Sequence, residues 1–238
     1  MREIWGETFT GADGFLDSAT YGLPSRTQTD VLRAALDDWE SGTQRMDRFD
    51  AAVEAARSAF ASLVGVPSGS VTIGSATSAL VGLVAAAVPD GGRIAVQRGE
   101  FTSVTAPFAA QATRGVTVEQ FDAGALESAL AASSAAKRDG AGGTGGGDRT
   151  GSPEGADSPD GGDGADSPFD LVAVSLVQSA DGRVLDTDLL RRALAGTRTR
   201  VVIDATQAVG WKRMDLSWAD AVVASGYKWL LAPRGTAW

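Results

Sequence analysis

The chain has 238 residues, a formal net charge of −9, and neither histidine nor cysteine. The absence of these two residue types excludes Ser-His-Asp and Cys-His triads, zinc sites built on His or Cys, iron–sulfur clusters and structural disulfides. No metal site is expected, so catalysis would depend on lysine, carboxylates, hydroxyls, arginine or a bound cofactor.

Most of the negative charge falls in one low-complexity segment, residues 139–168. This segment consists largely of Gly, Asp, Ser and Pro and contains seven acidic residues and one arginine. It cannot bury enough apolar surface to offset the entropy lost on ordering, so we expect a disordered acidic insert. The rest of the chain is near neutral and has no basic patch, which argues against a nucleic-acid partner.

Two features bear on localisation. No apolar run approaches the length of about eighteen residues that a membrane-spanning helix needs. The first residues also lack the charged and apolar regions of a signal peptide. We therefore expect a soluble, cytoplasmic protein with no membrane partner.

Two helices are expected first, over about residues 25–39 and 47–64. The second carries one apolar stripe, formed by Phe49, Val53, Ala56, Phe60 and Leu63. Such a stripe is typical of a helix that packs against a sheet or against a partner subunit. We treat residues 1–66 as an N-terminal helical segment and 67–238 as one large domain. That domain ends inside an apolar strand pattern, so we expect it to be truncated there.

From residue 71 onward, strand and helix patterns alternate. Strands are expected over residues 71–73, 93–96, 116–118, 171–175, 201–203 and 221–223. Helices are expected over residues 78–88, from 103, over 124–137 and over 186–194. The strand runs are apolar on both faces, which predicts an α/β fold with a mostly parallel sheet flanked by helices.

Lys228 is one of only three lysines and lies among apolar and small residues, 224–233. Burial disfavours the ammonium form and lowers the pKa of a lysine, which is useful where a neutral amine must form a Schiff base with a carbonyl. Asp204 follows a β-branched run and offers a carboxylate at a strand end. A strand-end acid and an apolar lysine are the two groups that a pyridoxal phosphate (PLP) enzyme needs.

The other groups that PLP requires occur at successive strand ends. Residues 74–78 could bind a phosphate at a helix N-terminus, or form an ordinary capped turn. Phe101 could stack on the cofactor ring, or be plain core. Gln207 could reach the phenolic oxygen of the ring, or lie on the surface, and Asp204 could simply cap the next segment. Their order along the chain favours the PLP interpretation.

Residues 202–210, 215–216 and 225–235 resemble the class V aminotransferase family, which includes cysteine desulfurases, kynureninases and isopenicillin N epimerase-like enzymes. Residues 15–22 are similar to the entry into the family's N-terminal region. Residues 174–179 and 225–237 look closest to the hercynylcysteine sulfoxide lyase subset. Phe101 and Tyr227 stand where standard desulfurases carry histidine, which points away from a standard desulfurase.

The resemblance implies the large domain of PLP fold type I, with a sheet of the seven-stranded type, and a homodimer to which residues 25–64 contribute. Lys228 would hold the cofactor as a Schiff base and then transfer protons, and Asp204 would pair with the ring nitrogen. The cofactor contacts that it implies are Ala76, Thr77, Phe101, Asp204, Gln207, Ser225, Tyr227 and Lys228. The family's smaller C-terminal domain supplies an arginine for the substrate carboxylate, and we expect that domain to be missing from this chain.

The function that the sequence favours is a PLP-dependent enzyme that acts on an amino acid and cleaves a C–S bond, as hercynylcysteine sulfoxide lyases or desulfurases do. An aminotransferase or an epimerase remains open, because the first steps are shared. A truncated, non-catalytic PLP-fold protein is a further alternative. A Rossmann oxidoreductase is disfavoured, because no Gly-x-Gly-x-x-Gly follows the first sheet strand.

Overall fold

The computed structural model describes residues 1–122, 124–126, 128–130 and 168–238. The predicted insert 139–168 therefore lies outside the described residues, except for Pro168. No helix within the described ranges is long and apolar enough to cross a bilayer.

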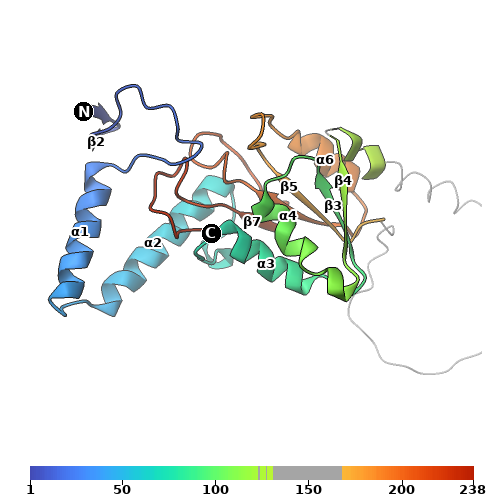
Figure 1. Cartoon of the computed structure of the whole chain (residues 1–238), viewed down its shortest axis with the longest axis horizontal. Helices are drawn as coiled ribbons and strands as arrows, with labels where there is room; N and C mark the ends of the chain where they lie inside the picture. Colours follow the sequence, from blue (N-terminus) through green and yellow to red (C-terminus); the bar gives the residue numbers. More distant parts are fainter. Residues whose placement is uncertain (123, 127, 131–167) are drawn as a thin grey trace, which may run out of the picture.

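The N-terminal part consists of a small hairpin and two long helices (Figure 1). Strands β1 (Arg2–Ile4) and β2 (Glu7–Phe9) pair in antiparallel fashion, a hairpin that the sequence patterns did not indicate. Helices α1 (Arg26–Glu40) and α2 (Met46–Val64) confirm the two predicted helices. Ser25 and Gln28 form a reciprocal capping box at the start of α1, which satisfies two otherwise free backbone N–H groups.

The remainder is a five-stranded parallel sheet with strand order β4-β3-β5-β6-β7. The strands are β3 (Arg93–Gln97), β4 (Thr117–Phe121), β5 (Leu171–Ser175), β6 (Arg200–Asp204) and β7 (Ala221–Val223). The intervening helices are η1 (Ser68–Ser70), α3 (Thr77–Ala87), α4 (Thr102–Ala109), η2 (Ala112–Arg114) and α6 (Thr187–Leu194). The predicted α/β architecture with a parallel sheet is confirmed, although the described residues form five parallel strands and not the seven-stranded type that was expected.

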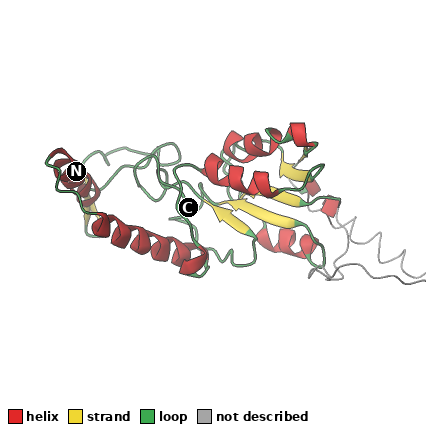
Figure 2. Cartoon of the chain, turned by 90° about the horizontal axis from the view of Figure 1, so that it is seen from below, coloured by secondary structure: helices red, strands yellow, loops and turns green. Residues whose placement is uncertain are grey.

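Helices cover both faces of this sheet, as Figure 2 shows. Along β6, Val202 points into a core with α3 and α4, while Val201 and Ile203 point into a core with α2 and α6. Successive strand residues face opposite sides, and both sides are covered at β3, β5 and β6, so each of these strands has an unbroken apolar run in its middle. No residue of the edge strand β4 is fully buried, and its sequence is mixed. The burial of both faces explains why the strand positions could be read from the sequence.

One expected strand differs. Residues 71–73 form no ladder, and Gly74 alone pairs, in an antiparallel bridge with Ala237. Ala237 also bridges Ser225 on its other side, and its N–H and C=O both bond Gly74, at 2.8 and 2.7 Å. The sheet is thus extended beyond β7 by two short antiparallel pairings. These pairings join residues far apart in sequence, so local strand propensity could not locate them.

Candidate active site

The polar side chains gather where the parallel strands end. Glu100 lies just after β3, Ser175 and Asp204 end β5 and β6, and Ser225 follows β7. The strand order changes direction at β3. The next strand in the chain, β4, pairs on one side of β3, and the following strand, β5, pairs on its other side. Open α/β sheets bind ligands at the carboxyl ends of strands beside such a switch point. A cavity of about 350 Å³ lies here.

All eight residues predicted from the sequence to contact a cofactor line this single cavity: Ala76, Thr77, Phe101, Asp204, Gln207, Ser225, Tyr227 and Lys228. The structure also brings Ser175, Ser179, Thr206 and Arg234 to its wall. All four lie in segments that resemble the family, but none of them was among the residues predicted to contact the cofactor. Ser179 and Thr206 follow β5 and β6 closely, so their positions near strand ends were a usable signal.

Asp204 lies at the floor of the cavity and is almost fully buried, with 5% of its surface exposed. Its Oδ1 accepts a 2.8 Å hydrogen bond from the backbone N–H of Thr206. Burial raises the pKa of Asp204, while hydrogen bonds from Thr206 and the charge of Lys228 act in the opposite direction. A carboxylate buried in the cavity wall interacts electrostatically with a group bound in the cavity.

Lys228 is likewise buried, with 8% of its surface exposed. Burial lowers the pKa of Lys228, and the nearby Asp204 carboxylate partly offsets that effect. Its Nζ lies 5.5 Å from the ring centroid of Phe101 and 6.0 Å from that of Tyr227. The two rings replace water around the amine, which favours its neutral, nucleophilic form.

Three hydroxyl groups form a cluster at the start of α3. The Thr77 hydroxyl lies 2.7 Å from that of Ser225 and 3.3 Å from that of Thr206. Ala76, at the N-cap, makes no side-chain cap bond, so no side chain covers the first N–H groups of the helix. An uncapped helix N-terminus next to hydroxyls suits an anion such as phosphate.

Glu100 is a partly buried acid that the sequence analysis did not single out. Its carboxylate accepts hydrogen bonds from the backbone N–H of Ser175 at 2.8 Å, the Ser175 hydroxyl at 2.5 Å and the Gln178 amide at 2.6 Å. Burial, and to a smaller extent the Asp204 charge, raise the pKa of Glu100, against these hydrogen bonds. Glu100 thereby ties the end of β3 to the end of β5 and fixes the loop that carries Phe101.

The N-terminal segment packs against the loop that carries Tyr227 and Lys228. The Gly22 N–H donates to the Tyr227 carbonyl at 2.8 Å, and a Cβ at residue 22 would lie 2.2 Å from the Lys228 carbonyl oxygen, so only glycine fits. Arg234 donates to the Tyr21 hydroxyl, and its guanidinium carbon lies 5.8 Å from the Tyr21 ring centroid and 5.6 Å from the Tyr227 ring centroid.

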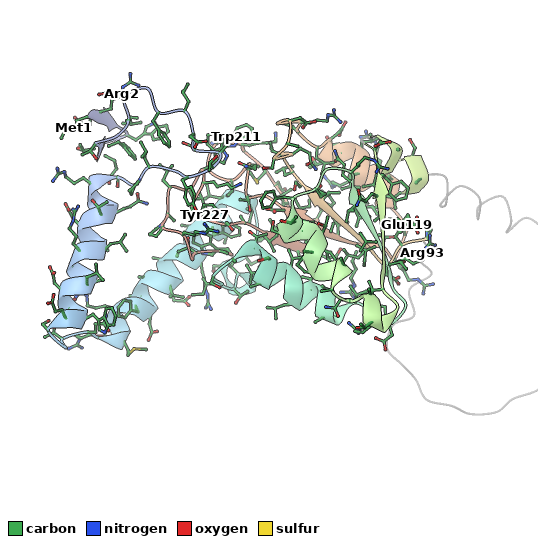
Figure 3. All side chains as sticks on the ribbon, viewed as in Figure 1. Met1, Arg2, Arg93, Glu119, Trp211 and Tyr227 are labelled. Atoms are coloured by element: carbon green, nitrogen blue, oxygen red, sulfur yellow. The ribbon has the colours of Figure 1, made fainter. Side chains whose placement is uncertain are left out.

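The two ends of the sheet differ in character. Tyr227 lies near the end of α2 that reaches the sheet, whereas Arg93 and Glu119 lie at the far side of the molecule (Figure 3). Arg93 and Glu119 form an exposed ion pair at 2.6 Å, and pairs of this kind contribute little to stability. The buried charged groups are therefore concentrated at the carboxyl ends of the strands.

The family model for class-V aminotransferases matches residues 164–237, which confirms the resemblance seen in the sequence. Comparison with curated proteins gives no significant match. Neither finding identifies the hercynylcysteine sulfoxide lyase subset, which stays a prediction.

Solved structures share the fold at low sequence identity. The cysteine desulfurase of Thermococcus onnurineus NA1 is 18% identical with a TM-score of 0.65, over 93% of this chain and 51% of that protein. The cystine C–S lyase C-DES, bound to cysteine persulfide, is 17% identical with a TM-score of 0.66, over 92% and 55%. The cysteine desulfurase CsdA of Escherichia coli is 18% identical with a TM-score of 0.66, over 96% and 55%.

These matches confirm the predicted fold, that of the large domain of fold-type-I PLP enzymes. A further structure of C-DES carries glycine covalently linked to its PLP cofactor, at 19% identity and a TM-score of 0.66. The chain spans about half the length of the proteins it matches.

Proposed function

We propose that this chain binds pyridoxal 5′-phosphate and forms part of an enzyme that acts on an amino acid, cleaving a C–S bond. The observation that carries the proposal is the pair Lys228 and Asp204. A buried amine with lowered pKa and a buried carboxylate line one cavity, at the strand ends of a fold that PLP enzymes share.

The side chains around this pair match the remaining parts of the cofactor. The hydroxyls of Thr77, Ser225 and Thr206, beside the uncapped start of α3, suit its phosphate. The Phe101 ring, half exposed toward the cavity, suits the face of its pyridine ring. Gln207 lines the same wall and would hold the phenolic oxygen.

When bound, PLP supplies an aldehyde to which amines add and a protonated ring that withdraws electrons from the substrate. Lys228 provides the amine that binds covalently. Because its pKa is lowered, a larger fraction of this amine is neutral at a given pH than for an ordinary lysine. The same Nζ can later hold and return a proton. Asp204 would keep a proton on the ring nitrogen, because water is largely excluded around its buried carboxylate and weakens the attraction between the two groups less than in solution.

The choice of a C–S bond is the finer part of the proposal. It is supported by the resemblance of residues 174–179 and 225–237 to C–S lyases and by the names of the matched structures, two cysteine desulfurases and a cystine C–S lyase. Assays of S-substituted cysteines for released sulfur species, pyruvate and ammonia test it. Exchange of the Cα proton or amino transfer without sulfur release would favour an epimerase or an aminotransferase instead.

Because the chain has only three lysines, PLP attachment can be tested with internal controls. We expect PLP to give a visible absorbance band, and borohydride reduction followed by mass spectrometry to place the cofactor on Lys228. Lys212 lies outside the set of residues that line the cavity, and we expect both Lys212 and Lys137 to stay unmodified. Equal labelling of all three lysines, or complete loss of PLP on dialysis before reduction, would contradict a specific site.

We also propose that the chain self-associates through α1. None of the residues of α1 is buried, although Leu32, Leu36 and Trp39 form an apolar stripe with 44%, 59% and 69% of their surfaces exposed. On α2, Phe49 and Leu63 of the predicted stripe are also exposed, and only Phe60 is buried. Exposed apolar side chains on two successive helices are typical of a protein–protein interface.

A charge placed in this stripe should therefore weaken a dimer. We expect Leu36→Lys to raise the dimer dissociation constant roughly 100-fold, because a two-fold interface loses the apolar contact twice. Asp37→Lys is the matched control, since position 37 points about 100° away around the helix. Sedimentation equilibrium measures both variants, and a monomeric wild-type chain would refute the assignment of α1 as the interface.

A further inference from the structure

The Gln207 side chain has a defined orientation. Its Oε1 accepts a 2.8 Å hydrogen bond from the indole N–H of Trp229, and its Nε2 donates to the Ala19 carbonyl at 3.1 Å. An indole N–H can only donate and a backbone carbonyl can only accept. Both contacts therefore require the same arrangement of the amide, and a flipped amide would lose both.

This arrangement decides what Gln207 offers to the cavity. One hydrogen on Nε2 is directed to Ala19, and the other has only a 3.4 Å contact with the Ser179 hydroxyl, which itself lines the cavity. A contact of that length is weak, so this N–H is free to bond an anionic oxygen in the cavity. Gln207 thus presents a donor there, and its acceptor is engaged by Trp229.

Trp229 is well placed to impose this orientation. It follows Lys228 directly, so one loop carries both the reactive amine and the group that orients the amide. A second indole, that of Trp211, donates to the Gln207 backbone carbonyl at 2.7 Å and packs edge-on against Trp229 with ring centroids 6.1 Å apart. Trp211 bonds only the main chain, so it has no direct influence on which way the amide faces.

We propose that Trp229 is a positioning residue: its indole N–H fixes the Gln207 amide so that Nε2 donates to the ionised ring oxygen of the cofactor. This inference rests on the proposed PLP function. Donation by Gln207 makes that oxygen less basic, and the bound cofactor therefore loses its shared proton at lower pH. Without the Trp229 N–H, only the 3.1 Å bond to the Ala19 carbonyl holds this arrangement, so the amide is less firmly oriented and the donor toward the cavity is weakened.

The test is the pH titration of the visible absorbance of bound PLP, which does not depend on turnover. Trp229→Phe keeps an aromatic ring and removes the donor. We expect the titration midpoint to rise by about one pH unit, the size expected when a hydrogen bond to a charged group is lost. Trp229→Leu, which also lacks the donor, gives a second determination.

Two controls make the result specific. Gln207→Ala should raise the midpoint in the same direction, and Trp229→Phe should add nothing further in that background, since both act through one bond. Trp211→Phe should leave the midpoint unchanged. Absence of a visible band in the wild-type chain would overturn the PLP function itself. A normal band with an unchanged midpoint in both Trp229 variants, or additive shifts in the double variant, would overturn the role of Trp229 alone.

Discussion

Replacement of Lys228 by alanine is expected to abolish the visible absorbance of bound PLP and to lower turnover by roughly 10⁴-fold. The variant loses the amine that binds the cofactor covalently and the group that carries protons near the substrate. Its environment supports both roles, because burial between the rings of Phe101 and Tyr227 lowers the pKa of Lys228. Absorbance spectra and single-turnover assays on the purified variant measure the two losses.

Lys212→Ala is the matched control for this experiment. It removes the same chemical group from a position outside the set of residues that line the cavity. We expect its spectrum and turnover to equal those of the wild type. A Lys228→Ala variant that keeps the wild-type band would mean that another amine holds the cofactor, and the assignment of Lys228 would be wrong.

The sequence allowed Lys228 and Asp204 to be picked out because each stands in a short, self-contained pattern. Lys228 interrupts an apolar run, and Asp204 ends a β-branched one. The strand positions could be read for a similar reason, since strands buried on both faces are continuous apolar runs. These features depend on a few neighbouring residues, and local physics is enough to predict them.

Glu100 and Arg234 could not be found in this way. Glu100 matters because β3 lies beside β5, which places it against Ser175, 75 positions further along the chain. Arg234 faces Tyr21, which is 213 positions away. Strand order and the path of the N-terminal segment are set by tertiary packing, so no local pattern reports them.

The same limit applies to residues 71–74 and to α1. A β-branched run at residues 71–73 predicts a strand, yet only Gly74 finds a partner, the distant Ala237. Helix α1 carries the apolar side chains Leu32, Leu36 and Trp39, yet no residue of α1 is buried within the single chain. In both cases the sequence indicates that a segment favours pairing or burial, but it does not indicate which segment or chain is the partner.

Asp204→Asn is expected to separate stability from function. At the active site, the variant lowers turnover roughly 10³-fold, the order of loss seen when one preorganised electrostatic contact is removed. PLP should still bind covalently, because Lys228 is intact, so the visible band distinguishes this variant from Lys228→Ala. The asparagine Oδ1 can still accept the 2.8 Å hydrogen bond from the Thr206 N–H. The loss therefore reports the missing charge.

The effect of Asp204 on the stability of the cofactor-free chain has the opposite sign. Burial raises the pKa of Asp204 above its unfolded value, so the folded state binds the proton more tightly. The tighter binding of the proton stabilises the folded state. This contribution is fully present below the pKa that Asp204 has in the unfolded chain, and it is lost as pH rises through its pKa in the folded chain. At neutral pH the buried carboxylate is thus a cost, and Asp204→Asn should raise the melting temperature by several degrees while reducing its fall between acidic and neutral pH.

Asp215→Asn supplies the control of opposite sign. Hydrogen bonds from Ser217 lower the pKa of the exposed Asp215, so its contribution to stability is present above the unfolded pKa and is lost as pH falls through the folded pKa. This variant should melt slightly lower than the wild type at neutral pH and turn over normally. Thermal melts of both variants across the acidic range test the contrast. If Asp204→Asn also melted lower at neutral pH, the buried charge would be a net source of stability, and its retention would need no functional explanation.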